Sequence, residues 1–157
     1  MDHQDARAVK SRWIFVGIAV VSACLFALST WAGQWWTDVD VAIGPMGTRG
    51  CVGGICGGGL RWTGGSELWM RTAVATWAGS LLTMMLLGGV AGAIAAKRVP
   101  KLLAKSVLTS LVTTAVAGIY FIVKMPTMPG LEVGQGMILF VAAIVLGAVT
   151  PIRVLRA

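Results

Sequence analysis

The sequence predicts an all-α transmembrane protein: a four-helix bundle with a small, disulfide-pinned β-hairpin or sheet in its first extracytoplasmic loop. Of its 157 residues, 57% are hydrophobic and only 12% are charged, with a mean hydropathy of +0.82, whereas soluble domains carry roughly 25% charged residues. Four apolar segments are long enough to cross a bilayer core of about 30 Å. One polar, glycine-rich stretch carries two cysteines and most of the tryptophans.

The basic residues lie on alternate connections between the expected spans. Nine of the thirteen precede the first span, separate the second from the third, or follow the last: Arg7, Lys10, Arg12, Lys97, Arg98, Lys101, Lys105, Arg153 and Arg156. Only Asp2 and Asp5 oppose them. Positive charge gathers on cytoplasmic connections, so we expect a multi-pass protein of the cell (inner) membrane with both termini cytoplasmic. The net charge of +7 then reflects topology and affinity for anionic lipid, with no nucleic-acid partner.

We expect one membrane domain over residues 1–157, with spans at about 13–31, 72–96, 106–123 and 134–152. Tryptophans suited to the two interfaces bracket the first span, at Trp13 and Trp31. A basic lead followed by an apolar run is also typical of a signal peptide. This run is longer than a signal's apolar core, and STWAGQWW lacks the small-residue cleavage pattern. We therefore expect a retained helix.

The second span contains Gly88 and Gly92 in a small-xxx-small arrangement. Such spacing lets helix backbones approach closely where lipid supplies no hydrophobic driving force. It predicts packing against another helix of the same chain, with homo-oligomerisation as the alternative. Pro100 then breaks the helix in a short cytoplasmic turn.

The third span is rich in threonine, and Pro126 and Pro129 interrupt the outer connection that follows it. Met137 to Thr150 forms most of the fourth span, after which Pro151 and a basic tail end the chain. We expect no ionisable residue inside the spans, which disfavours a pump, a proton-coupled carrier or a charged-ion channel. Hydroxyls are expected to form hydrogen bonds locally or between helices.

The outer loop, residues 32–71, is expected to hold any specific recognition. Its segment Asp38 to Ile43 alternates polar and apolar residues and predicts one strand of a hairpin. Cys51 and Cys56 lie on the oxidising side of the predicted topology, where thiols pair. A bridge closing so short a loop contributes about 2–3 kcal/mol and would fix the tip of the hairpin.

A redox-active cysteine pair is the alternative interpretation of Cys51 and Cys56. Redox motifs usually place two residues between the cysteines, at a helix N-terminus that lowers the thiol pKa. Here four residues intervene, in a glycine-rich loop. We expect no metal site, because two cysteines do not complete a zinc shell. We also expect no cofactor, because the glycine run lacks the GK[ST] end of a phosphate loop.

Tryptophans gather at the expected outer boundary, and the simplest interpretation is an anchor belt at the membrane interface. The alternative is a partner-binding surface, since Trp and Arg dominate the hot spots of interfaces. The candidates for it are Trp35, Trp36, Arg61, Trp62 and Trp69.

The layout resembles the claudin-like tetraspan superfamily, which carries a tryptophan, then Gly-Leu-Trp, then two cysteines in a large first outer loop. Trp35 or Trp36 matches the single tryptophan, and Cys51 and Cys56 match the cysteine pair. Gly44-Pro45-Met46 stands where Gly-Leu-Trp belongs, and Arg71 follows the loop as an arginine commonly does in the family. The resemblance implies a left-handed bundle topped by a small β-sheet, with adhesion, barrier or accessory-subunit roles.

No paired carboxylates and no Ser/His/Asp set appear in the sequence. We therefore expect a non-enzymatic tetraspan that acts as a scaffold, adhesion or accessory subunit. Its partners would be the lipid bilayer and other membrane proteins that meet its outer loop. A thiol–disulfide redox protein using Cys51 and Cys56 is the first alternative. A small transporter or channel subunit is the second, and it would need a polar path through the bundle.

Overall fold

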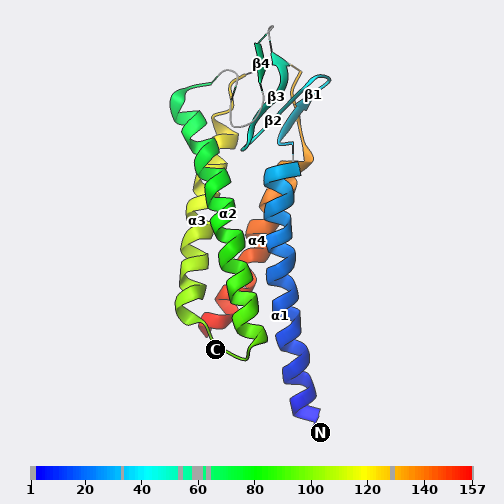
Figure 1. Cartoon of the computed structure of the whole chain (residues 1–157), viewed down its shortest axis with the longest axis vertical. Helices are drawn as coiled ribbons and strands as arrows, with labels where there is room; N and C mark the ends of the chain where they lie inside the picture. The colour runs from blue at the N-terminus through cyan, green and yellow to red at the C-terminus, as the bar shows by residue number, and fades with distance from the viewer. Residues whose placement is uncertain are drawn as a thin grey trace.

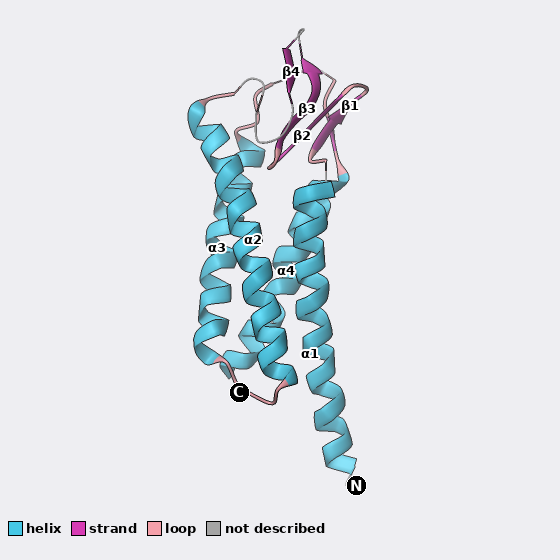
Figure 2. Cartoon of the chain, viewed as in Figure 1, coloured by secondary structure: helices cyan, strands magenta, loops and turns pink. Residues whose placement is uncertain are grey.

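The computed structural model is a bundle of four long helices with a small β-sheet seated on one end (Figures 1 and 2). It describes residues 3–32, 34–52, 55–57, 62, 65–127 and 130–156. All four helices are long and apolar enough to cross a membrane, as expected for a multi-pass membrane protein. Both chain termini lie at the end of the bundle opposite the sheet (Figure 1), which we call the basal end.

The helices follow one another around the bundle. They are α1 (His3–Ala27), which continues into a π-helical turn, η1 (Leu28–Ala32), then α2 (Glu67–Ala95), α3 (Lys101–Val123) and α4 (Gln135–Arg156). Helix α1 packs against α2 and α4, and α3 packs against the same two helices. Large apolar side chains such as Met85, Leu102 and Val116 are exposed on the outside, which suits contact with lipid.

All four helices extend beyond the predicted spans, and α3, for example, begins at Lys101 and not near residue 106. Helix α1 begins at His3 and not near Trp13, because its polar lead is rich in good helix formers such as Ala, Lys and Arg. Helix α2 begins at Glu67, where the Ser66 hydroxyl accepts a hydrogen bond from the Trp69 amide (3.2 Å) as an N-cap. Helix α4 continues through Pro151 to Arg156, beyond the predicted end of the fourth span at about residue 152. Membrane helices tolerate such a proline because neighbouring groups satisfy the freed carbonyl.

The sheet is antiparallel and has five strands in the order β4-β3-β2-β1-β5. Four come from the first outer connection and the fifth from the second: β1 (Trp36–Asp38), β2 (Val41–Gly44), β3 (Gly47–Val52), β4 (Ile55–Gly57) and β5 (Glu132–Val133). The prediction of a small sheet in the connection between the first two spans is therefore confirmed. The contribution of a strand from the second connection was not predicted.

The prediction of one continuous strand over Asp38 to Ile43 is wrong. Val39 and Asp40 form the turn between β1 and β2, and Asp38 pairs with Val41 across it. The Asp38 carboxylate accepts a hydrogen bond from the adjacent Val39 amide (2.7 Å), and Asp is a residue that turns favour. The alternation of polar and apolar residues therefore reflects two short strands and their turn.

Candidate functional site

The outer sheet is attached to the bundle through buried aromatic side chains. Trp35 is fully buried, and its ring centroid lies 4.7 Å from that of Phe140 and 5.6 Å from that of Phe121. Its indole N–H donates to the Ser29 carbonyl (3.0 Å) in the π-helical turn that ends the first span. The last carbonyls of a helix lack partners within the helix. Trp35 therefore joins α1, α3 and α4 and satisfies one such carbonyl.

Trp69 in the first turn of α2 packs on Phe121 too, and it joins α2 to α3. Its side chain is 1% exposed, and its ring stacks on Phe121 at 4.8 Å between centroids. Its indole N–H donates to the Phe121 carbonyl (2.9 Å), in the last turn of α3. The first turn of α2 is thus held against the end of α3.

Backbone hydrogen bonds connect the two outer connections directly. The Gly134 amide donates to the Trp35 carbonyl (2.8 Å), and the Gly136 amide, in the first turn of α4, donates to the Gln34 carbonyl (2.9 Å). A Cβ added at Gly134 would collide with the Gln34 carbonyl oxygen, so this close approach requires glycine. The sheet is therefore held to the first turn of α4 as well as to the other helices.

The turn between β1 and β2, which we call the β1–β2 tip (Asp38, Val39 and Asp40), is highly exposed. Val39 is 94% exposed, and both aspartates are exposed. Beside the tip lies a recess of about 340 Å³, lined by these three residues together with Gln34, Val41, Ala42, Arg49 and Gly50. Arg49 also donates to the Trp31 carbonyl (3.3 Å) at the end of the first span. The recess therefore presents the negative charges of Asp38 and Asp40 and the positive charge of Arg49, and Arg49 is hydrogen-bonded to the end of the first span.

The predicted cysteine pair lies across two neighbouring strands. Cys51 on β3 and Cys56 on β4 are directly opposite each other in the register. The Cys51 side chain is exposed, whereas the side chain of Cys56 lies outside the described part of the structure. Cys24, in the first span, is a free and exposed cysteine.

Most of the predicted partner-binding residues lie inside the protein. Trp35, Trp36 and Trp69 are at most 7% exposed. Trp35 and Trp36 pack the sheet against the bundle, Trp69 packs α2 against α3, and none of the three presents a surface to a partner in this conformation. Trp62 is half-buried and donates to the Gly44 carbonyl (2.9 Å). Arg61 lies outside the described residues. The outward-facing residues at the β1–β2 tip and Arg49 were not among the predicted candidates, because exposure in a turn leaves no distinctive sequence pattern.

The prediction that Gly88 and Gly92 pack against another helix of the same chain is wrong. Both residues are exposed, and a Cβ built on either has no described atom within 4 Å. Close packing occurs instead at Gly79, Gly118 and Gly147, where an added Cβ would meet Thr114, Phe140 and Ser22 respectively. Small residues four apart on α3, Ser110, Thr114 and Gly118, were the sequence signal for this contact.

Buried hydroxyls in the spans form hydrogen bonds with groups of the protein. Ser22 on α1 donates to the Ala143 carbonyl on α4 (2.8 Å), and the Thr83 hydroxyl on α2 lies 2.7 Å from that of Ser110 on α3. Thr150 on α4 donates to the Phe15 carbonyl on α1 (3.1 Å). These bonds link neighbouring helices, which is the role that the sequence predicts for them.

Within the described residues, no group of three or more His, Cys, Asp or Glu side chains is arranged to hold a metal ion. Comparison with known proteins finds no family, no curated protein and no solved structure that matches this chain.

Proposed function

We propose that this protein is a non-enzymatic tetraspan of the inner membrane that acts as a scaffold, adhesion or accessory subunit through its outer sheet. The observation that carries the proposal is the attachment of the sheet. Strands from both outer connections are joined to each other, and Trp35 and Trp36, at the start of β1, pack against Phe140 and Phe121 of the bundle. A binding surface works best on a rigid support, and this arrangement gives the β1–β2 tip and its recess such a support.

The proposed orientation places the basal end in the cytoplasm. Helix α2 ends beside Lys97 and Arg98, and Arg153 and Arg156 occupy the last turn of α4. Four of the acidic residues, Asp38, Asp40, Glu67 and Glu132, lie in the sheet or at the sheet end of α2, whereas Asp5 lies in α1 at the basal end. Positive charge favours the cytoplasmic side, so the sheet would face outward.

A claudin-like relationship remains part of the proposal. It draws support from the shared arrangement of four helices, an outer sheet and paired cysteines in the first outer connection. The Gly44-Pro45-Met46 segment, which stands where the family has Gly-Leu-Trp, begins at the end of β2 and supplies the turn that leads to β3. Adhesion or an accessory-subunit role would follow from that relationship.

We further propose that Cys51 and Cys56 form a structural disulfide between β3 and β4. Their direct opposition in the register supports pairing. Because both cysteines lie on strands, neither is at a helix N-terminus, the position that lowers the thiol pKa of redox-active cysteines. In intact cells, a membrane-impermeant maleimide is expected to label Cys51 only after treatment with an impermeant reductant. Because Cys24 lies within a span, a Cys24→Ala variant serves as the background.

Two other labelling results would contradict this proposal. Labelling without reductant would show free outer thiols, and a mixture that shifts with growth conditions would favour redox chemistry. Labelling only after the cells are lysed would place the sheet on the cytoplasmic side and reverse the orientation.

The binding role itself is tested by photo-crosslinking from the β1–β2 tip. A photoreactive amino acid at Val39 is expected to give a discrete adduct of constant mass in cells. The matched control is Val112, which is 63% exposed on the outside of α3, among lipid-facing side chains. Replacing Arg49 with alanine in the recess should weaken the Val39 adduct severalfold.

The mass of the adduct identifies the class of partner. Twice the mass of the chain would indicate self-association through the sheet, and a larger or smaller increment would indicate a different protein. The absence of any adduct from Val39, or the same pattern from Val39 and Val112, would contradict a recognition role for the tip.

A further inference from the structure

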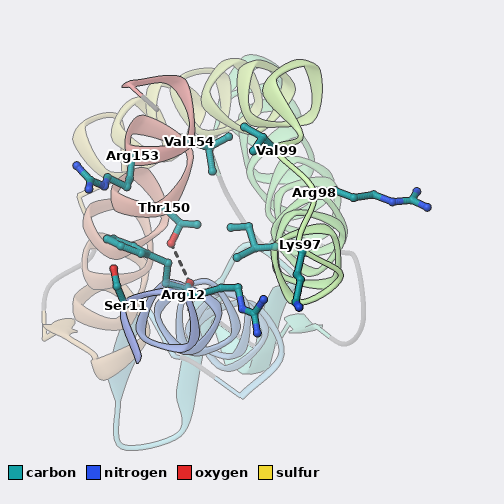
Figure 3. Close-up of a pocket in the computed structure, with 10 residues that line it drawn as sticks. Ser11, Arg12, Lys97, Arg98, Val99, Thr150, Arg153 and Val154 are labelled. Atoms are coloured by element: carbon teal, nitrogen blue, oxygen red, sulfur yellow. Dashed lines mark hydrogen bonds between the residues drawn. The ribbon is translucent and has the colours of Figure 1, made fainter. Parts of the chain in front are cut away.

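A second candidate site lies at the basal end, remote from the sheet. An opening of about 550 Å³ lies between α1, the end of α2 and α4 (Figure 3). Its lining is mainly apolar and includes Phe15, Ile94, Val99 and Val154. Thr150 lies in the lining too, but its hydroxyl donates to the Phe15 carbonyl. The opening therefore suits an apolar chain.

Basic side chains surround this apolar opening. Arg12, Lys97, Arg98 and Arg153 all belong to its lining. Figure 3 shows Arg12 and Lys97 extending toward the same side of the opening, while Arg98 and Arg153 point away in opposite directions. Arg12 comes from α1 and Lys97 follows α2, so the fold brings two positive charges from distant parts of the sequence to one place.

These two charges have no acidic partner in the described part of the chain. The only described ion pair joins Glu67 to Arg71, at the sheet end. The Nε atom of Arg12 is buried and has no hydrogen-bond partner among the described groups. Like charges repel, and a buried donor without an acceptor is costly. A bound anion would remove both costs.

The backbone at Lys97 is also unusual. Lys97 has a φ of 60°, and its amide donates to the Ile94 carbonyl (3.0 Å) while the Arg98 amide donates to the Ala93 carbonyl (2.9 Å). This is the Schellman ending of a helix, in which the left-handed position is usually glycine. A lysine there costs free energy that glycine would not, and such outliers justify a hypothesis of function.

We propose that this basal opening binds an anionic phospholipid. The phosphate would lie between Arg12 and Lys97, and an acyl chain would lie along Phe15, Ile94 and Val154. Charge complementarity selects the negative headgroup, and the apolar lining selects a ligand with a hydrocarbon chain over a free anion. This proposal is independent of the role of the outer sheet.

The test uses the full chain purified in a neutral detergent, with bound lipid measured by native mass spectrometry. Phosphatidylglycerol is expected to bind about tenfold more tightly than phosphatidylcholine, because two cations contribute. Arg12→Gln and Lys97→Gly should each weaken phosphatidylglycerol binding about fivefold. Lys105→Gln is the matched control, because it removes one exposed charge from the first turns of α3, outside the opening, and should change binding less than twofold.

Lys97→Gly separates binding from folding. Glycine suits the left-handed backbone, so the thermal midpoint of the lipid-free protein should stay equal or rise while lipid binding falls. Three results would overturn the proposal. They are equal binding of the two lipids, an equal loss in Lys105→Gln, and full displacement of the lipid by millimolar inorganic phosphate, which would indicate a site for free anions.

Discussion

Replacing Trp35 with alanine is expected to lower the free energy of unfolding by about 3–5 kcal/mol. The side chain is fully buried against Phe121 and Phe140, so its removal leaves a large cavity between the sheet and three helices. It also leaves the Ser29 carbonyl without its indole donor. Detergent-to-SDS titration followed by far-ultraviolet circular dichroism would measure the loss.

Two further variants separate the contributions at this position. Trp35→Phe keeps a ring but removes the hydrogen bond, so we expect a smaller loss, about 1–3 kcal/mol. Trp31→Ala is the matched control, because Trp31 is 42% exposed and its replacement should change stability by less than about 1 kcal/mol. Equal losses in Trp31→Ala and Trp35→Ala would show that the tryptophans act as a general interfacial belt.

Replacing Gly118 with leucine is expected to lower the free energy of unfolding of the bundle by about 3 kcal/mol or more. A Cβ alone at this position would lie 2.5 Å from Cε1 and 2.6 Å from Cζ of Phe140. The Phe140 ring is itself 1% exposed and is held by contacts with Phe26 and Trp35, so it has no space to move aside. Helices α3 and α4 would have to separate at their outer ends.

Gly88→Leu is the matched control for this substitution. No described atom lies within 4 Å of a Cβ at Gly88, and leucine is a better helix former than glycine by up to about 1 kcal/mol. We therefore expect unchanged or slightly higher stability, measured by the same titration. A loss of stability that depends on protein concentration would instead show that Gly88 and Gly92 pair between two copies of the chain.

Gly88 and Gly92 face outward whereas Gly79 contacts another helix, and this difference shows why helix packing is hard to predict from the sequence. The spacing of Gly88 and Gly92 is the familiar pattern for close helix contacts, but rotation of α2 turns these two residues outward. Gly79, which lies on a different face of the same helix, packs on Thr114. In a span that is apolar all around, hydrophobicity does not mark the inner face. Only the positions of buried hydroxyls, such as Thr83 and Ser110, carry that information.

The sheet shows a second limit on what can be predicted from the sequence. Its existence followed from the polar, glycine-rich composition of the first outer connection, but its register depended on particular turns. The Asp38 side chain closes a turn inside the segment predicted as one strand. The β5 strand, Glu132–Val133, is too short to be recognised alone, and it exists because the second connection passes beside β1.

The number of helices, their order and the gathering of basic residues at the basal end could all be predicted from the amino-acid sequence, because hydropathy and charge are local properties of the chain. The tertiary structure decided which tryptophans are buried, which glycines meet another helix and which cations share an opening. Those features depend on helix rotation and on contacts between residues far apart in the chain. Trp35 contacts Phe140, and Arg12 and Lys97 line one opening, and no single span contains the information that specifies these arrangements.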